Sequence, residues 1–254
     1  MSIFDLTNKV AIVTGAGSGL GRQFATALAG EGANVALLAR RIEKLEETKT
    51  ILDELGSDTI VVKCDVNNNE EIKQAVAAVK EHYGRIDILV NNAGVATVAP
   101  SEEHTDEEWE RVINTNLNSV FYMSREVGKV MIEQNYGKII NLGSIHSRVT
   151  MQGSPIAAYC AAKGGVFMLT KEMAVEWAPY NITVNAIGPS YFPSEMTGGH
   201  LAIPEVLAAI NARCPMGRVG KPSELDGALI YFASDASSFT TGQLLNVDGG
   251  WTAA

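Results

Sequence analysis

Short, nearly continuous apolar runs alternate with longer stretches of mixed apolar and polar residues along the chain. The apolar runs, which predict strands, are Lys9–Thr14, Asn34–Leu38, Thr59–Lys63, Ile86–Asn91, Lys138–Leu142, Ile182–Ala186 and Gln243–Val247. The stretches between them that suit helices are Leu20–Glu31, Ile42–Leu55, Glu70–His82, Glu107–Gln134, Ala157–Ala178 and Ser223–Ser234. Strands that are apolar on nearly every residue and alternate with helices indicate a parallel sheet covered on both faces.

This alternation predicts a single α/β domain over residues 1–254, a Rossmann-type doubly wound parallel sheet of about seven strands. In such a sheet the ligand lies at the carboxyl ends of the strands, so residues just after each strand are the first functional candidates. One helix start is marked by Thr105 and Glu108, which fit a capping box. The apolar stripe expected from there is Trp109, Val112, Ile113, Val120, Val127 and Met131, with the polar Asn116 on the same stripe.

Composition and charge exclude several kinds of partner. The chain has 20 basic and 29 acidic residues, interspersed, for a net charge of −9, which disfavours nucleic acid and anionic membrane surfaces. No apolar run approaches the ~20 residues that span a bilayer, and the first nine residues lack the features of a secretory signal. The three cysteines form no C-x-x-C pair and the four histidines no ligand pattern. We therefore expect a cytoplasmic protein with reduced thiols and no metal.

The first predicted strand runs into a glycine-rich turn that opens a helix, Thr14-Gly-Ala-Gly-Ser-Gly-Leu-Gly21. Glycines permit the tight turn and let a pyrophosphate approach the N–H groups at the helix N-terminus, where the helix dipole favours an anion. A glycine cluster alone is weak evidence. Its position between a strand and a helix of the first βαβ unit predicts a dinucleotide site.

The second strand ends without the acidic residue that would select NAD by binding the ribose 2′-hydroxyl. Ala39 takes that place, and the two arginines that follow could pair with a 2′-phosphate. We therefore expect NADP(H), with Arg40 as its partner, and keep NAD(H) as an alternative; Arg40 and Arg41 could also be solvated residues that open the next helix. After the third strand, Asp65 either lies near the adenine edge of the dinucleotide or caps a turn before Asn67.

Five segments together resemble one known family. They are Thr14–Gly21, Asn91-Asn-Ala-Gly94, Tyr159-Cys-Ala-Ala-Lys163, Asn185-Ala-Ile-Gly-Pro189 and Val247-Asp-Gly-Gly250. In this order the segments resemble the short-chain dehydrogenase/reductase family over nearly the whole chain. A further set resembles its keto-sugar-acid reductases of the gluconate 5-dehydrogenase type: Phe4–Thr7, Val184–Pro189, Tyr191-Phe192, Met216–Arg218 and Gly220–Glu224.

The resemblance implies an oxidoreductase that moves a hydride between a nicotinamide cofactor and a ketone or secondary alcohol, with a keto-sugar acid such as 5-ketogluconate as substrate. It also implies a homotetramer. The catalytic residues it implies are Asn116, Ser144, Tyr159 and Lys163. The cofactor-binding residues it implies are Gly15, Ser18, Gly19, Leu20, Arg40, Asp65, Val66, Asn92, Ala93, Gly94, Tyr159, Lys163, Pro189 and Ser194. Asn92 is expected mainly to brace the central strands.

Tyr159 and Lys163 carry the expected chemistry, because residues four apart lie on the same face of a helix. A phenol with its ordinary pKa of about 10 is too weak a base at neutral pH. We expect the neighbouring ammonium, together with the positive ring of an oxidised nicotinamide, to lower that pKa. Tyr159 would then exchange a proton with the substrate oxygen, while Ser144 at the end of the fifth strand hydrogen-bonds that oxygen. The resemblance implies that Lys163 also holds the nicotinamide ribose.

Two assignments stay open on the catalytic side. The stretch between Ser144 and Tyr159 is slightly longer than the family pattern, which makes Ser147 a rival of Ser144. Asn116 either holds a water that links Lys163 to solvent, as the resemblance implies, or bonds to a neighbouring helix.

The segment of about residues 189–215, expected as a loop over the substrate, forms the other side of the predicted site. Candidates for substrate contact are His146, Tyr191 and Phe192. A Ser144–His146 hydrolase is set aside, since Gly143-Ser-Ile145 is no G-x-S-x-G elbow and no carboxylate completes a triad. The loop is apolar through Tyr191, Phe192, Met196, Leu201 and Ile203. A hydroxysteroid or 3-oxoacyl substrate is therefore the alternative, and a non-catalytic dinucleotide sensor is the remote one.

Overall fold

Within residues 2–151 and 153–254, which this computed structural model describes, seven strands form one parallel sheet in the order β3-β2-β1-β4-β5-β6-β7. The strands are β1 (Val10–Thr14), β2 (Asn34–Ala39), β3 (Thr59–Lys63), β4 (Ile88–Asn91), β5 (Gly137–Leu142), β6 (Ile182–Pro189) and β7 (Leu244–Val247). The strand order reverses between β1 and β4, where open α/β sheets form their ligand crevice. The predicted doubly wound α/β fold is confirmed.

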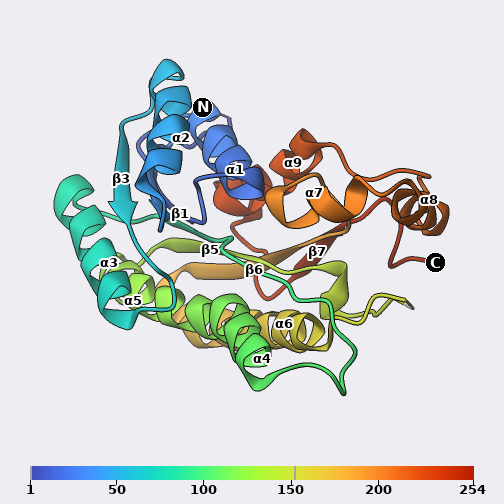
Figure 1. Cartoon of the computed structure of the whole chain (residues 1–254). Coiled ribbons are helices and arrows are strands. Elements are labelled where there is room, and N and C mark those ends of the chain that lie inside the picture. The colour runs from blue at the N-terminus through green and yellow to red at the C-terminus, as the bar shows by residue number, and fades with distance from the viewer. Residues whose placement is uncertain (1, 152) are drawn as a thin grey trace.

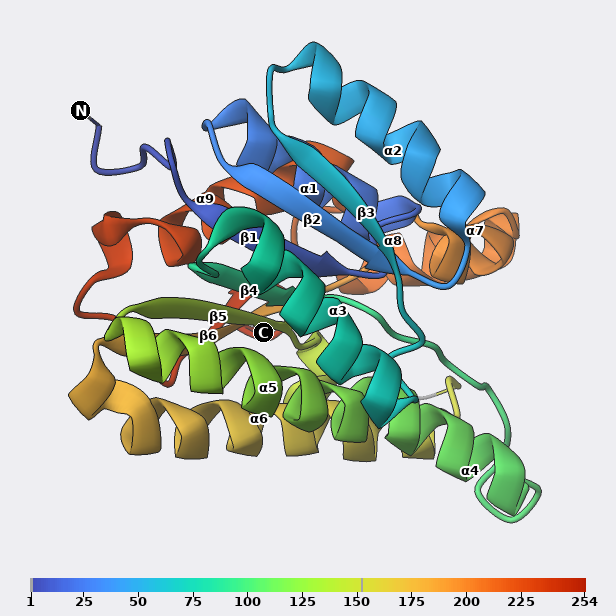
Figure 2. The same cartoon turned by 90° about the vertical axis from the view of Figure 1, so that its left-hand side faces the viewer.

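Helices cover both faces of the sheet (Figures 1 and 2). The α-helices are α1 (Gly19–Gly30), α2 (Ile42–Glu54), α3 (Asn69–Tyr83), α4 (Asp106–Ile113), α5 (Ser119–Gln134), α6 (Ala157–Trp177), α7 (Glu195–Leu201), α8 (Pro204–Arg213) and α9 (Asp226–Ala233). The π-helical turn is η1 (Asn114–Asn118), and the 3₁₀ turns are η2 (Ile145–Ser147), η3 (Ala178–Tyr180), η4 (Pro222–Leu225) and η5 (Asp235–Ser237).

Alternate side chains of a strand point to opposite faces of the sheet, and each face packs into its own hydrophobic core. In β1, Ala11 and Val13 pack with α1, α2 and α9, whereas Val10 and Ile12 pack with α3, α5 and α6. Because the strands are buried on both faces, they read as continuous apolar runs in the sequence. Figure 2 shows the two helical layers on opposite sides of the strands.

The segment between β6 and η4 differs most from its prediction. The expected loop of residues 189–215 contains two helices, α7 and α8, which lie together beyond one end of the sheet (Figure 2). Seven and ten residues are too few to show a clear helical period among so many apolar positions. We refer to residues 190–213 as the lid.

The predicted helix Glu107–Gln134 is interrupted at its middle. The capping box of Thr105 and Glu108 is confirmed at the start of α4, but the π-helical turn η1 separates α4 from α5. The extra residue in that turn shifts the helical phase, and Trp109 is 43% exposed rather than part of the buried stripe.

Two kinds of feature are absent from residues 2–151 and 153–254. No helix there has the length and apolar character that a membrane crossing requires. In the same ranges, no three His, Cys, Asp or Glu side chains converge as metal ligands. Cys64 and Cys214 are buried free thiols, and burial raises the pKa of Cys64 to about 12, which keeps it protonated.

Candidate functional site

A cleft of about 750 Å³ opens at the carboxyl ends of the strands, under the lid. This volume is typical of small-molecule and cofactor sites. The predicted site residues that line it are Gly15, Ser18, Gly19, Leu20, Arg40, Asp65, Val66, Asn92, Ala93, Gly94, Ser144, Tyr159, Lys163, Pro189, Phe192 and Ser194. Asn116, His146 and Tyr191 lie outside the lining.

Other lining residues were not predicted as site residues. They include Val95, Ala96, Val98, Arg111, Thr115, Ser190, Glu195, Met196 and Thr197. Arg41, one of the two arginines expected at a 2′-phosphate, also lines the cleft. Residues 95–98 continue from the end of β4, so the strand-end rule would have found them. The lid residues carry no comparable signal, because their position depends on contacts with distant parts of the chain.

The glycine-rich turn is shaped for a ligand that approaches the backbone. Gly15 and Gly19 have φ of +67° and +52°, which favour glycine. A Cβ on Gly21 would collide with the carbonyl oxygen of Gly15, so the start of α1 can pack against the turn only with glycine there. Ser18 caps α1 without a side-chain bond to the helix. The turn and its free helix N-terminus fit a pyrophosphate group.

The ends of β2 and β3 form the next part of the cleft. Arg40 is exposed on its rim, while the Arg41 guanidinium lies 2.9 Å from the Glu195 carboxylate of the lid. Asp65 lines the cleft and also accepts a hydrogen bond of 3.0 Å from the N–H of Asn67. The turn-capping alternative for Asp65 is therefore confirmed, and its place near the adenine edge of a dinucleotide stays a prediction.

The loop after β4 is held in place by two asparagines. Asn92 donates through Nδ2 to the carbonyl oxygen of Thr14 at 2.9 Å, which ties β4 to β1 as expected. Asn116 is fully buried in η1; its Oδ1 accepts from the N–H of Val95 at 2.8 Å, and its Nδ2 donates to the Val95 carbonyl at 2.7 Å. The alternative that Asn116 bonds to a neighbouring helix is wrong, because both ends of its amide bond to the loop.

Lys163 and Tyr159 lie together on α6, as their spacing predicts. Lys163 is buried, its Nζ donates to the carbonyl oxygen of Leu142 at 2.6 Å, and Nζ lies 5.6 Å from the centre of the Tyr159 ring. Burial lowers the pKa of Lys163 to about 8. Burial also raises the pKa of Tyr159 to about 12, with the Ser144 hydroxyl opposing that rise. The expected lowering of the phenol pKa is therefore not found in the chain alone.

Ser144, and not its rival Ser147, lines the cleft beside Tyr159. The Ser144 hydroxyl hydrogen-bonds the Tyr159 side chain and accepts from the N–H of His146 at 3.1 Å. Ser147 instead accepts from the N–H of Ser144 at 3.3 Å and does not line the cleft. The two serines close the turn η2 from both sides, which fixes Ser144 next to Tyr159.

His146 and Tyr191 lie near Tyr159 but do not line the cleft. His146 is buried, its Nδ1 lies 3.0 Å from the Val149 carbonyl oxygen, and its ring meets the Tyr159 ring edge-on at 6.2 Å. Burial lowers the pKa of His146, which keeps the imidazole neutral. The Tyr191 hydroxyl lies 3.3 Å from the Met151 sulfur, and its ring packs against Trp251.

Two residues hold the start of the lid: the ring of Phe192 anchors it in the core, and Ser194 caps its first helix, α7. Phe192 is only 3% exposed and packs into the core of α1 and α9. Ser194 accepts from the N–H of Thr197 at 3.2 Å, which caps α7. Phe192 and Ser194 both line the cleft.

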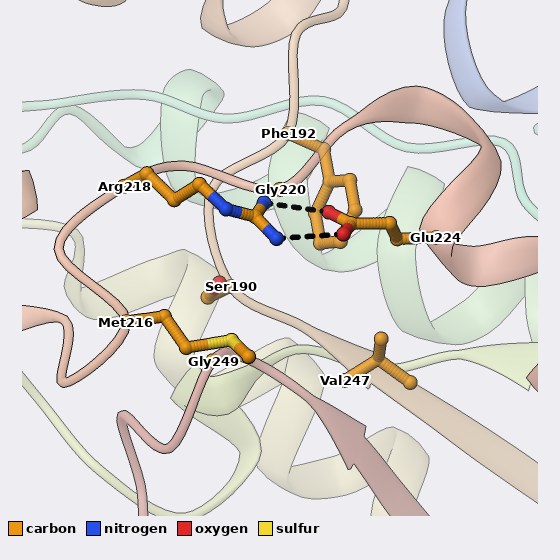
Figure 3. A pocket seen from close by; sticks show the side chains of 8 residues that line it. All are labelled: Ser190, Phe192, Met216, Arg218, Gly220, Glu224, Val247 and Gly249. Carbon is orange, nitrogen blue, oxygen red and sulfur yellow. Dashed lines mark hydrogen bonds and ion pairs between the residues drawn. The ribbon is translucent and has the colours of Figure 1, made fainter.

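A small second cavity of about 130 Å³ lies behind the lid (Figure 3). It is lined by Ser190, Phe192, Met216, Arg218, Gly220, Glu224, Val247 and Gly249. Figure 3 shows Arg218 and Glu224 facing each other, and both of their contacts measure 2.7 Å. Arg218 and the Lys221 N–H lower the pKa of Glu224 to about 2. The Met216–Arg218 and Gly220–Glu224 segments thus support the back of the lid, and Ser190 and Phe192 are shared with the main cleft.

Known proteins resemble this chain over nearly its whole length. The family model described as Enoyl-(Acyl carrier protein) reductase matches residues 15–252. Gluconate 5-dehydrogenase of Gluconobacter oxydans (strain 621H) is 39% identical over 250 residues, 98% of this chain and 97% of that protein. NAD-dependent glycerol dehydrogenase of Listeria innocua serovar 6a is 37% identical over 98% of this chain and 96% of that protein.

Solved structures are similar over the same length. One is a gluconate 5-dehydrogenase from Burkholderia cenocepacia J2315 in complex with NADP and tartrate. It superposes with a TM-score of 0.95 at 37% identity, and the match covers 99% of this chain and 98% of that one.

Proposed function

The chain belongs to the short-chain dehydrogenase/reductase family of nicotinamide-dependent oxidoreductases, and on that premise we propose that it interconverts a keto-sugar acid, such as 5-ketogluconate, and the corresponding alcohol with NADP(H). One observation carries the proposal: Ser144, Tyr159 and Lys163 meet at the inner wall of a cleft whose outer part suits a dinucleotide. The full-length likeness to a gluconate 5-dehydrogenase, and the tartrate in a similar structure, support a hydroxy-acid substrate.

Tyr159 is proposed to exchange the proton with the substrate oxygen. Its high pKa keeps the phenol protonated, as an acid that protonates a forming alkoxide must be. A bound nicotinamide supplies or accepts the hydride and, in its oxidised form, adds a positive charge to the cleft. For alcohol oxidation the phenol has to be deprotonated, and that added charge would favour its ionised form.

Ser144 and Lys163 are proposed to assist this proton transfer. The Ser144 hydroxyl stands beside the phenol, where it can hydrogen-bond the same substrate oxygen and stabilise its developing charge. Lys163 is proposed to hold the cofactor's ribose, and its pKa near neutrality makes it able to relay a proton. Asn116 is proposed to position the loop after β4 through Val95 and, as the family resemblance implies, to hold a water near Lys163.

NADP(H) is proposed as the preferred cofactor. Ala39 supplies no carboxylate at the end of β2, and Arg40 and Arg41 stand next to it on the rim of the cleft. NAD(H) is the alternative, since one relative is an NAD-dependent glycerol dehydrogenase.

A homotetramer is proposed as the assembly. Apolar side chains are exposed along α5 and α6, where Phe121, Met168 and Val175 are 40%, 60% and 77% exposed. Exposed apolar patches of this kind are typical of interfaces between copies. Light scattering after size exclusion measures the mass directly, and a monomer would contradict the proposal.

The test is a steady-state assay with NADPH and NADH against 5-ketogluconate, a steroid ketone and an acetoacetyl thioester. We expect the highest kcat/KM for 5-ketogluconate with NADPH. Turnover of the steroid or the thioester alone would replace the sugar-acid substrate with a hydrophobic ketone. A higher kcat/KM with NADH would overturn the role given to the arginines.

A further inference from the structure

Glu195, the first residue of α7, reaches across the rim of the cleft to the cofactor side. Its carboxylate lies 2.9 Å from the guanidinium of Arg41, and Arg41 together with the nearby Ser18 hydroxyl lowers the pKa of Glu195. Ser18 caps α1 in the glycine-rich turn, and Arg41 caps α2 just after β2. Glu195 therefore joins the lid to both of the elements that frame the outer part of the cleft.

The groups around this carboxylate are those that a phosphate would use. A guanidinium and a hydroxyl hydrogen-bond a carboxylate or a phosphate in the same way. Lys44 adds a further positive charge near Glu195, and Arg40 stands on the same rim. Since Ala39 leaves no carboxylate on β2 itself, the acidic group at this point of the cleft comes from the lid.

We propose that Glu195 is a cofactor-discriminating residue whose carboxylate competes with the 2′-phosphate of NADP(H) for Arg41 and Ser18. NAD(H), which lacks that phosphate, leaves the contact of Glu195 with Arg41 in place, whereas NADP(H) has to displace it. The inference rests on the proposed cofactor site at the end of β2, and it adds that the lid senses the 2′-phosphate.

The exposure of Arg41 and Glu195 limits how much their contact can change the affinity for a 2′-phosphate. Arg41 and Glu195 are 53% and 59% exposed, so water and salt screen their attraction. We expect removal of the Glu195 charge to strengthen binding of a 2′-phosphate by about fivefold, well short of the effect of a buried pair. Raising the salt concentration should reduce this gain, because it is electrostatic.

The test is equilibrium binding by calorimetry, which needs no turnover. The probes are 2′,5′-ADP, which carries the 2′-phosphate, and 5′-AMP, which does not. The variant Glu195→Gln keeps the side-chain size and removes the charge. The matched control is Glu205→Gln on α8, an exposed lid glutamate in the first turn of its helix.

We expect Glu195→Gln to bind 2′,5′-ADP about fivefold more tightly and 5′-AMP with unchanged affinity, and Glu205→Gln to change neither. With Arg41→Met in both proteins, the gain from Glu195→Gln should largely disappear, because the contested group is gone. An unchanged affinity for 2′,5′-ADP, or an equal gain for both nucleotides, would overturn the inference; an equal gain would mean that the lid blocks the cleft without regard to the phosphate. Failure of the sugar-acid assay leaves this result standing, so the two proposals fail separately.

Discussion

The inner wall of the cleft and the lid over it are built in opposite ways. On the inner wall, Lys163 is buried and bonded to a main-chain oxygen, and the buried Asn116 outside the lining is bonded to both main-chain groups of Val95, which lines the cleft. The lid is held by the buried ring of Phe192 and by the exposed pair of Glu195 with Arg41. The difference teaches that the fold fixes the proposed catalytic side chains. The lid, which is held in part by an exposed ion pair, can change position at a small cost in free energy.

The largest effect is expected on the inner wall, at Tyr159, the proposed proton donor. Tyr159→Phe should lower kcat by about 100-fold or more, the scale of a lost acid–base group. The matched control is Tyr180→Phe, an exposed tyrosine of η3 far along the chain, which should leave kcat unchanged. Full activity of Tyr159→Phe would assign the proton to another group.

The next largest effect tests how firmly that wall is held. Asn116→Ala leaves both main-chain groups of Val95 without their partner and should lower the free energy of unfolding by about 2 kcal/mol. Asn114→Ala, at an exposed asparagine of the same turn, should cost no more than about 0.5 kcal/mol. Urea unfolding measures both values. Equal values would mean that the amide of Asn116 is not what holds the loop.

A smaller effect is expected on the lid side. An added Cβ at Gly220 would collide with the ring of Phe192, so Gly220→Ala should move the lid anchor and raise KM severalfold. Because kcat depends on the inner wall, it should change less than KM. The control is Gly198→Ala in α7, where an added Cβ meets no atom within 4 Å. A loss confined to kcat would show that the lid and the reacting atoms are not independent.

The smallest effect concerns the buried charge of Lys163. Burial lowers its pKa from 10.5 to about 8, so between these pH values the unfolded chain binds more protons than the folded one. Its contribution to the free energy of unfolding therefore rises with pH from about 8 to about 10.5. Unfolding of Lys163→Met across this range should show a flatter rise than the wild type. Lys171→Met, at an exposed lysine on the same helix, should keep the wild-type slope.

The sheet could be predicted because burial leaves a direct mark on the sequence. The strand Thr59–Lys63 was predicted with its observed bounds, since its apolar residues Ile60 and Val62 pack into one core and Val61 into the other. Ser144 and Asn92 were predicted from the family resemblance together with their positions just after strand ends, where the topology of a parallel sheet brings residues together.

The position of the lid, the buried polar network and the pKa of Tyr159 depend on contacts between residues far apart in the sequence, which no local pattern contains. Glu195 and Arg41 are 154 residues apart, and nothing in the lid sequence indicates where its first turn will land. A buried network joins Asn141 to Asn91 and Thr170 through bonds of 2.9 Å between three different elements. The high pKa of Tyr159 was missed because it follows from the amount of surrounding protein, which the spacing to Lys163 does not reveal.

The ring of Phe192 forms part of two walls, one toward the cleft and one toward the small cavity behind it. Met216 and Val247 line the small cavity together with that ring. Substitutions of Met216 or Val247 can therefore shift the ring of Phe192 and change the shape of the main cleft. They do so without altering Ser144, Tyr159 or Lys163. A change at either position would act on the cleft indirectly, through the position of a ring that the two compartments share.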